Sequence, residues 1–275
     1  MAHPQLDLAY EQTQDGRTWL KTARARHPWW LARSFQGDAV DTTLTVIPQS
    51  ATSVLMSGDR IVQRIIARRG TEARVVSAGS QVVHAARDND TAKTFWQIIA
   101  HTDAALACIQ HPTVLMPGAI FDQRIDLVVD PASRLVYSDG LTWHGPEEVP
   151  AFASVYSHTR ILSPDGRALA LERFDANAET ITRETAASPR PIKVVGQLLV
   201  LGATDESLGS ALSIALTDQD DAICGVGRLP NDAGWVVRIL ASSGSSFRAC
   251  QEVAWRTASG FGSETNSAWL PRIGL

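Results

Sequence analysis

The sequence predicts a mainly β protein that carries two α-helices in its C-terminal third. From Leu6 to about Ile192, short runs of β-branched and apolar residues alternate with turn-forming residues, as is typical of closely spaced strands. No helical pattern separates these runs, which excludes parallel βαβ units and favours a layered or coiled sheet structure. Beyond residue 201, apolar residues recur at three- and four-residue spacing, which indicates helices. We expect one domain over residues 1–275, with a strand-rich body at about 6–200 and a helix-containing part at about 201–275.

The predicted strands follow one another closely along the body. They are TTLTVIP (42–48), RIVQRIIA (60–67), EARVVSA (72–78), QVVHAA (81–86), FWQIIAH (95–101), ALACIQ (105–110), RIDLVV (124–129) and RLVYS (134–138). Turn-forming stretches such as SGD, RRGT, DND and DPAS divide them.

One further strand, DGRALALERF (165–174), is entered through an Asp-Gly turn and contains an acidic residue. Because side chains alternate between the faces of a strand, Glu172 shares its side with Ala168, Ala170 and Phe174. A carboxylate in a row of alanines is unusual. An ion pair with a neighbouring arginine across the sheet is the simpler explanation of Glu172, and a binding role is the alternative.

Two segments in the last third predict helices, and GWVVRILA (234–241) predicts a strand between them. In ATDESLGSALSIALTD (203–218), Thr204 and Asp205 are candidates for the N-cap. In SSFRACQEVAWRTASG (245–260), Ser245 or Ser246 is the expected cap and Gly260 the expected stop.

Composition and charge exclude several classes of protein. The net charge is -4 and the pI is about 6.0, so we expect no nucleic-acid partner. The cluster of Arg60, Arg64, Arg68, Arg69 and Arg74 is better explained as a solvated strand face than as a phosphate-binding patch, and it could also be a protein-docking surface. Three widely spaced cysteines argue against a disulfide framework. With no signal sequence or apolar span apparent, we expect a cytoplasmic protein without a membrane partner.

The sequence contains no motif of established catalytic chemistry. There is no phosphate loop, nucleophile elbow or H-E-x-x-H pattern. Cys108 and His111 form a C-x-x-H, but in an extended segment they would point to opposite faces, so a buried thiol and a turn histidine are favoured over a pair of metal ligands. Asp59 follows Ser57 and Gly58, and in such a turn it more often bonds its own backbone than a ligand.

Taken together, several stretches resemble the UreD (UreH) family of urease accessory proteins. These are the opening LDLAYEQTQDGRTWLKTARARHPWWLARSF, SGDRIVQRIIARRGTEARVVSAGSQVV, DGRALALERF, VVGQLLVLGATDESLGSALSIAL, GWVVRILASSGSSFRACQEVAWRTA and the terminal LPRI. The resemblance covers nearly the whole chain and lies in the order and spacing of these stretches.

The resemblance implies a distorted β-helix of stacked sheets with two helices, and a protein that is not an enzyme. It implies a scaffold between apo-urease and a complex of UreF with the GTPase UreG, through which nickel passes to the urease active site. By position, Glu172 and Asp59 would be acids of that nickel conduit, with no tightly bound cofactor and only transient Ni²⁺. Isolated carboxylates suit a conduit, because an ion must be released again.

Two other classes of function remain open from the residues. In a β-helical enzyme acting on carbohydrate, Asp59 and Glu172 would serve as general acid and base, but such an enzyme needs an aromatic-lined groove, and the strand around Glu172 offers only Phe174. The other alternative is a binding module that handles no metal.

Overall fold

The computed structural model describes residues 3–36, 43–144, 152–185, 188, 191–219 and 221–260. Strands account for 52% of the residues, and the sheets coil into a β-solenoid of about three turns. The predicted mainly β class and the distorted β-helix are therefore confirmed. The terminal stretch at 270–273 that contributed to the family resemblance lies outside the described residues.

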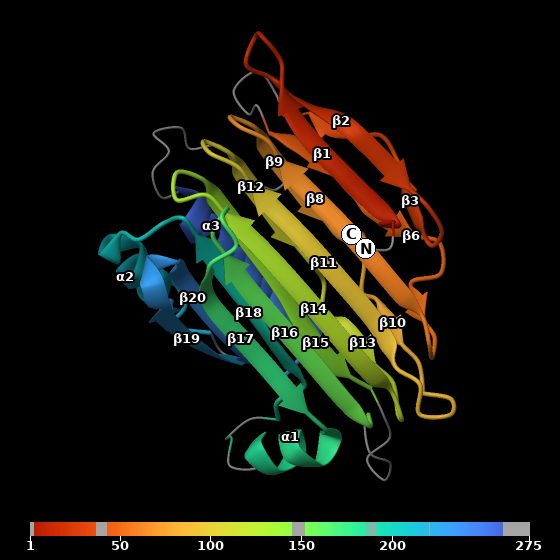
Figure 1. The fold of residues 1–275 in the computed structure, drawn as a ribbon. Coiled ribbons are helices and arrows are strands. Elements are labelled where there is room, and N and C mark those ends of the chain that lie inside the picture. The colour runs from red at the N-terminus through yellow and green to blue at the C-terminus, as the bar shows by residue number, and fades with distance from the viewer. Residues whose placement is uncertain are drawn as a thin grey trace.

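The first sheet has seven strands and faces the viewer in Figure 1. In spatial order they are β17 (Ala168–Ala176), β16 (Ser154–Leu162), β14 (Ile120–Val129), β11 (Ala92–Ala100), β8 (Arg60–Ala67), β1 (Leu6–Gln12) and β2 (Thr18–Ala25). Strands β1, β8, β11, β14 and β16 pair in parallel, and only the outermost pairs are antiparallel. The chain thus returns to this sheet once in every turn of the solenoid.

The second sheet has eleven strands and lies behind the first. Its main path is β19 (Ala222–Arg228), β20 (Gly234–Ala241), β18 (Val194–Leu201), β15 (Arg134–Trp143), β12 (Ala105–Ile109), β9 (Glu72–Val76), β5 (Leu44–Val46) and β4 (Phe35–Gln36). The short strands β7 (Val54–Leu55), β10 (Val82–Val83) and β13 (Thr113–Leu115) extend it. A separate ribbon joins β3 (Trp29–Leu31) to β6 (Pro48–Ser50).

The hydrophobic pattern of the strands explains why the two sheets stack. In β8, Ile61, Gln63, Ile65 and Ala67 are buried while the residues between them are exposed or half-buried, and β11 alternates in the same way. Leu8, Ile65, Ile98, Leu127 and Tyr137 belong to the main core cluster, to which both sheets contribute. The strands of the first sheet therefore present alternate side chains to the solenoid interior and to the surface.

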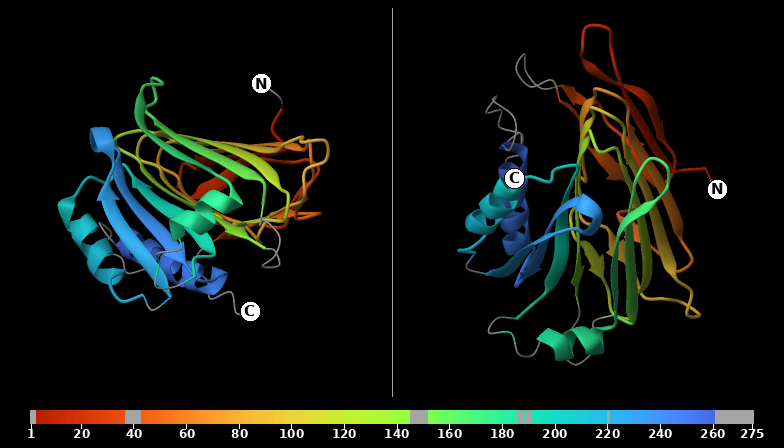
Figure 2. Two further views of the ribbon diagram at one scale, coloured as in Figure 1. Left: turned by 90° about the horizontal axis from the view of Figure 1, so that it is seen from below. Right: turned by 60° about the vertical axis from the view of Figure 1, so that its left-hand side comes forward.

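Helices cover the outer face of the second sheet only (Figure 2). Helices α2 (Glu206–Ala215) and α3 (Gly244–Gly260) pack on that face through a second apolar cluster that includes Leu212 and Phe247. Both predicted helices are present. Asp205 caps α2 by accepting a hydrogen bond from the backbone N–H of Ser207, as expected, and α3 includes the expected stop, Gly260.

Two local expectations were wrong. The Ser243 hydroxyl accepts from the backbone N–H of Ser246, so the capping side chain of α3 precedes the two serines proposed from the sequence. A further short helix, α1 (Ala178–Thr185), lies in the strand-rich body, where no helix was expected. Its first turn is capped by the Asn177 side chain, which accepts from the N–H of Thr180. A 3₁₀ turn, η1 (Pro230–Asp232), precedes β20.

A bulge changes the faces of strand β17. Its register against β16 shifts so that Ile161 lies opposite Ala170 while Leu162 lies opposite Ala168, which leaves Leu169 as the extra residue. Ala170 is buried but Ala168 is exposed, so the row of alanines expected beside Glu172 is reduced to one.

Candidate functional site

Glu172 lies at the edge of the first sheet and forms an ion pair with the second. Its carboxylate Oε2 accepts a hydrogen bond from Nη2 of Arg238 in β20. The Glu172 side chain is 17% exposed, whereas that of Arg238 is 60% exposed. An arginine partner agrees with the simpler explanation of Glu172, but the pair connects two sheets instead of neighbouring strands of one sheet.

A second carboxylate, Asp139, lies deeper in the interior. Residues Asp139 in β15, Gln197 in β18 and Arg238 in β20 occupy successive positions across the second sheet. Burial raises the pKa of Asp139 to about 6, while hydrogen bonds from Gln197, Tyr137 and Gln123 act in the opposite direction. At neutral pH the carboxylate is therefore mostly ionised, although it is only 8% exposed.

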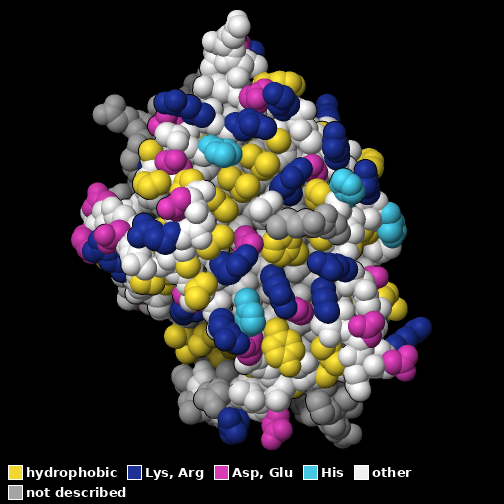
Figure 3. Space-filling model, viewed as in Figure 1, with side chains coloured by type: hydrophobic (Ala, Val, Ile, Leu, Met, Phe, Trp, Pro, Cys, Tyr) yellow, Lys and Arg dark blue, Asp and Glu magenta, His cyan; other side chains and the backbone are white. Residues whose placement is uncertain are grey.

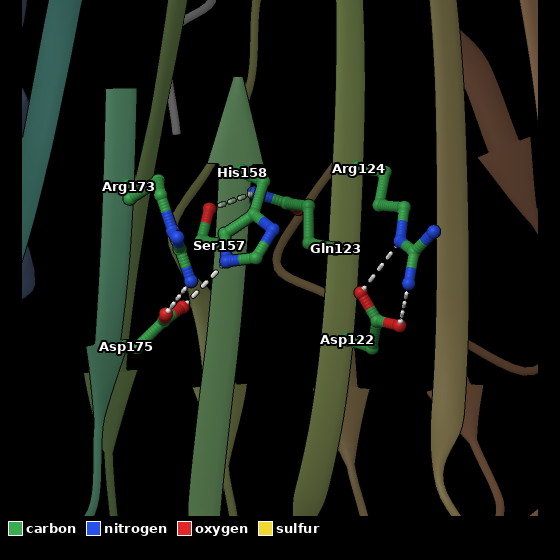
Figure 4. Close-up of polar contacts among 7 residues, drawn as sticks. All are labelled: Asp122, Gln123, Arg124, Ser157, His158, Arg173 and Asp175. Atoms are coloured by element: carbon green, nitrogen blue, oxygen red, sulfur yellow. Dashed lines mark hydrogen bonds and ion pairs between the residues drawn. The ribbon is translucent and has the colours of Figure 1, made fainter. Parts of the chain in front are cut away.

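Gln123 connects the two sheets at this point. Its side-chain Nε2 donates to Asp139 Oδ2 at 2.8 Å and to Ser157 Oγ at 3.2 Å. Figure 4 shows Gln123 reaching Ser157 on the neighbouring strand, while Asp175 lies between His158 and Arg173. Gln123 thus holds Asp139 against the polar side chains that the first sheet presents to the interior.

Two cavities adjoin the Asp139 position. The larger cavity, about 270 Å³, is lined by Trp29, Trp96, His111, Gln123, Tyr137 and Asp139 among others. The smaller cavity, about 60 Å³, is lined by Asp139, Ser157, Thr159, Glu172, Gln197 and Arg238 among others. Asp139 lines both, so the buried carboxylate lies between them and Glu172 lies on the side of the smaller one.

Further polar groups face the same interior. The side-chain amide of Gln63 and the hydroxyl of Thr94 are buried and make no hydrogen bond to a protein group within the described ranges. Thr94 lies directly opposite Gln123 in the pairing of β11 with β14, and Gln63 lies opposite Trp96 in the pairing of β8 with β11. The interior of the first sheet therefore carries a polar row beside the apolar core. Buried polar groups of this kind are usually satisfied by water or by a ligand.

Asp59 lies far from this interior site. Its Oδ2 accepts a hydrogen bond from the backbone N–H of Met56 at 2.8 Å, which is the turn contact that the sequence favoured. Asp59 directly precedes β8, and β8 lies four strand spacings, roughly 19 Å, from β17, the strand that contains Glu172. Asp59 lines neither of the two cavities.

The structure separates Cys108 from His111. Cys108 is completely buried in the main core, and burial raises the pKa of its thiol well above the ordinary value. His111 follows β12 and lines the larger cavity, where burial and the nearby Arg248 lower its pKa. Of the sequence candidates, Glu172 and His111 thus flank Asp139, one at each cavity. No group of three or more His, Cys, Asp or Glu suited to hold a metal ion occurs among the described residues.

Asp139 was missed because it is followed by glycine. Ser-Asp-Gly has the composition of a turn, so the strand was expected to end at Ser138. Strand β15 instead continues to Trp143. The two-residue period of Leu135, Tyr137, Asp139 and Leu141 was the available signal, because it places the acid on the apolar side of the strand.

Comparison with known proteins finds relatives over most of the chain. The model of the family described as UreD urease accessory protein matches residues 2–274. A urease accessory protein UreD 1 of Methylorubrum extorquens (strain PA1) is 29% identical over 233 residues, which is 84% of this chain and 79% of that protein. One from Pseudomonas syringae pv. syringae (strain B728a), also named UreD 1, is 24% identical over 254 residues, 90% and 88% of the two chains. A UreD of Haloquadratum walsbyi (strain DSM 16790 / HBSQ001) is 26% identical over 267 residues, 92% and 84% of the two chains.

No helix within the described part of the chain is both long enough and apolar enough to cross a lipid bilayer.

Proposed function

Because the chain belongs to the UreD family of urease accessory proteins, we propose that it is a non-catalytic maturation scaffold that bridges apo-urease and a UreF–UreG complex and conducts Ni²⁺ toward the urease active site. GTP hydrolysis would belong to UreG, in keeping with the absence of a phosphate loop in this sequence. We place the scaffold in the cytoplasm, where the metalloenzyme would be assembled. Nickel is the cargo of this protein and is bound only in passage.

The observation that best supports a nickel conduit is the position of Asp139. It is a buried carboxylate that lines a cavity on each side, and Glu172 and His111 line those two cavities with it. A buried charge without a counter-ion is costly for a fold to retain. Asp139 instead has neutral hydrogen-bond donors around it, Gln123, Tyr137 and Gln197. This arrangement leaves the negative charge available to a cation.

The oxygen atoms available as metal ligands suit the passage of nickel better than its storage. Carboxylate, amide and hydroxyl oxygens from Asp139, Gln123 and Ser157 can replace water around a divalent cation, but they hold nickel less tightly than a set of thiolates and imidazoles would. The side-chain amide of Gln63 and the hydroxyl of Thr94, which have no hydrogen-bond partner among the described residues, add further oxygen ligands on the interior of the first sheet. The ion pair of Glu172 with the largely exposed Arg238 is open to exchange at the edge of this path.

We keep Glu172 as a conduit acid and add Asp139 to it. Asp59 is proposed as a peripheral acid, because its carboxylate is engaged by the Met56 backbone and lies roughly four strand spacings from Glu172. Cys108 has no role in the proposal, since its buried thiol resists ionisation.

The test is reconstitution of urease activation with purified apo-urease, UreF, UreG, GTP and limiting nickel. Asp139→Asn and Glu172→Gln remove one negative charge each and keep the size and planar shape of the side chain, with one acceptor oxygen replaced by an NH2 donor. We expect both variants to form the complex and to lower the amount of active urease severalfold. Asp165→Asn, which removes an exposed carboxylate from the turn before β17, is the matched control and should activate normally.

Two outcomes separate the parts of the proposal. Normal activation by both variants would contradict the conduit and leave the bridging role standing. Failure of the wild-type protein to co-purify with either UreF or apo-urease would contradict the bridging role itself.

A further inference from the structure

The outer face of the first sheet is broad and is covered by no helix in the described part of the chain (Figures 1 and 2). Its outward residues on β8, β11, β14 and β16 are rich in cations, which gather over these strands in Figure 3. We call this surface the arginine face and define it by Arg60, Arg64, Lys93, Arg124, His158 and Arg160. A groove of about 670 Å³ lies on it, lined by five of these six residues together with Val62 and Phe95.

The arginine face holds more positive charge than its acids neutralise. Each acid of the groove has an arginine of its own, Arg124 with Asp122 at 3.2 Å and Arg160 with Asp126 at 2.6 Å. Arg64 is likewise paired, with Asp7 on β1 at 2.7 Å. The face thus remains cationic although the whole protein has a net charge of -4.

Arg60 and Lys93 account for the excess. They lie directly opposite each other on neighbouring parallel strands and are both exposed. Neither has an ion-pair partner among the residues that the structure describes. Like charges directly opposite in a sheet repel each other and destabilise the pairing. An anionic group placed between them would remove that repulsion.

The centre of the groove is apolar. Val62 and Phe95 are half-buried neighbours in the pairing of β8 with β11, and the cations surround them. An aromatic and aliphatic centre with an arginine-rich rim is the composition of protein interfaces and provides more contact than a small anion could use.

We propose that the arginine face is the docking surface for a carboxylate-rich surface of apo-urease, with carboxylates placed at Arg60 and Lys93 and an apolar side chain over Val62 and Phe95. This inference rests on the proposed scaffold function and adds to it the place and chemistry of one contact. The client must leave once it has received nickel, and a charge-dominated contact forms rapidly and is released more readily than a large apolar one. The client therefore fits this face better than a permanent partner does.

The experiment measures binding of apo-urease to the assembled complex of this chain with UreF and UreG, at low and at moderate salt. Arg60→Glu/Lys93→Glu should weaken binding roughly tenfold. Binding by the wild-type protein should fall as salt rises, since exposed charges are screened. A poly-L-glutamate peptide should compete with apo-urease for the wild-type complex, and this arm of the test does not depend on the folding of a variant.

The matched control is Arg17→Glu/Arg69→Glu. It makes the same change in net charge at two exposed turns off the arginine face. We expect it to bind apo-urease as the wild type does. The milder Arg60→Gln/Lys93→Gln should bind apo-urease with an affinity between those of the wild type and of the charge-reversed variant, Arg60→Glu/Lys93→Glu. Its melting temperature verifies that it is folded.

Two other results would contradict either the arginine face as the client surface or the scaffold function itself. If the reversed variant binds apo-urease normally, or loses UreF in place of apo-urease, the arginine face is not the client surface and the scaffold function is unaffected. If the wild-type complex does not bind apo-urease at any salt concentration, the scaffold function fails and this inference fails with it.

Discussion

The guanidinium of Arg238 in β20 donates a hydrogen bond to the carboxylate of Glu172 in β17, and this ion pair joins the edge of the first sheet to the second. Both residues line the smaller cavity with Asp139. Glu172 is therefore at once a contact between the two sheets and the outermost acid of the proposed nickel path.

The two roles of Glu172 can be separated by a double-mutant cycle. The ion pair is partly exposed, so we expect Glu172→Ala and Arg238→Ala each to lower the free energy of unfolding by about 1 kcal/mol or less. Urea denaturation of both variants and of the double variant measures the coupling. If Glu172 also conducts nickel, only the variants that lack it should activate urease poorly. A loss of activation in Arg238→Ala as large as that in Glu172→Ala would instead assign the effect to the contact between the sheets.

The buried carboxylate of Asp139 should make stability depend on pH. Its folded pKa of about 6 lies above the ordinary value of 3.8, so between these pH values the unfolded chain has lost a proton that the folded protein retains. Ionisation then opposes folding, and stability falls as pH rises through this window. Relative to Asp139→Asn, the wild type should lose about 2 kcal/mol between about pH 4 and pH 7. Urea denaturation of both proteins across this range measures it, and parallel pH profiles would contradict the raised pKa.

The smaller cavity should be sensitive to blocking. Ser157→Leu adds three carbon atoms to a cavity of about 60 Å³ without removing any carboxylate. It also removes the hydroxyl that accepts from Gln123. We expect the variant to fold and to bind its partners but to deliver less nickel in the reconstituted assay.

The control for blocking is Ser157→Ala, which removes the same hydroxyl and leaves the cavity open. Because it loses only one neutral oxygen ligand and leaves the passage open, it should activate urease better than Ser157→Leu does. Equal loss in both variants would point to the hydrogen bond with Gln123, and no loss in Ser157→Leu would contradict passage through this cavity.

The packing of helix α3 against the second sheet depends on Gly196. A Cβ at this position would lie 2.4 Å from Cε2 of Phe247 and 2.6 Å from the carbonyl oxygen of Asp139. Gly196→Ala should therefore displace the helix or the strand that carries Asp139 and destabilise the fold by about 1 to 3 kcal/mol. Gly225→Ala in β19 is the control, because nothing lies within 4 Å of its Cβ. Thermal melting of the two variants compares them, and equal melting temperatures would contradict the close contact.

The amino-acid sequence alone determined the elements whose causes are local. The alternation in RIVQRIIA predicts β8, and the cap at Asp205 predicts α2, because both signals lie within a few residues. Local signals gave wrong predictions where the same short stretch of residues is compatible with two kinds of secondary structure. Asn177 followed by Glu179 caps a helix in a region otherwise filled with strands, and Asp139-Gly140 continues a strand although it resembles a turn.

Only the tertiary structure decided which polar residues meet. Gln123, Asp139, Glu172 and Arg238 lie on four different strands of two sheets, and they come together because the solenoid stacks one sheet on the other. No spacing rule relates such residues, since the number of residues in each connecting turn sets which side chains face each other. The bulge at Leu169 illustrates the point, because one extra residue moves Ala168 out of the row that contains Glu172. The sequence thus named Glu172 as an unusual acid, while the stacking of the sheets assigned its partner.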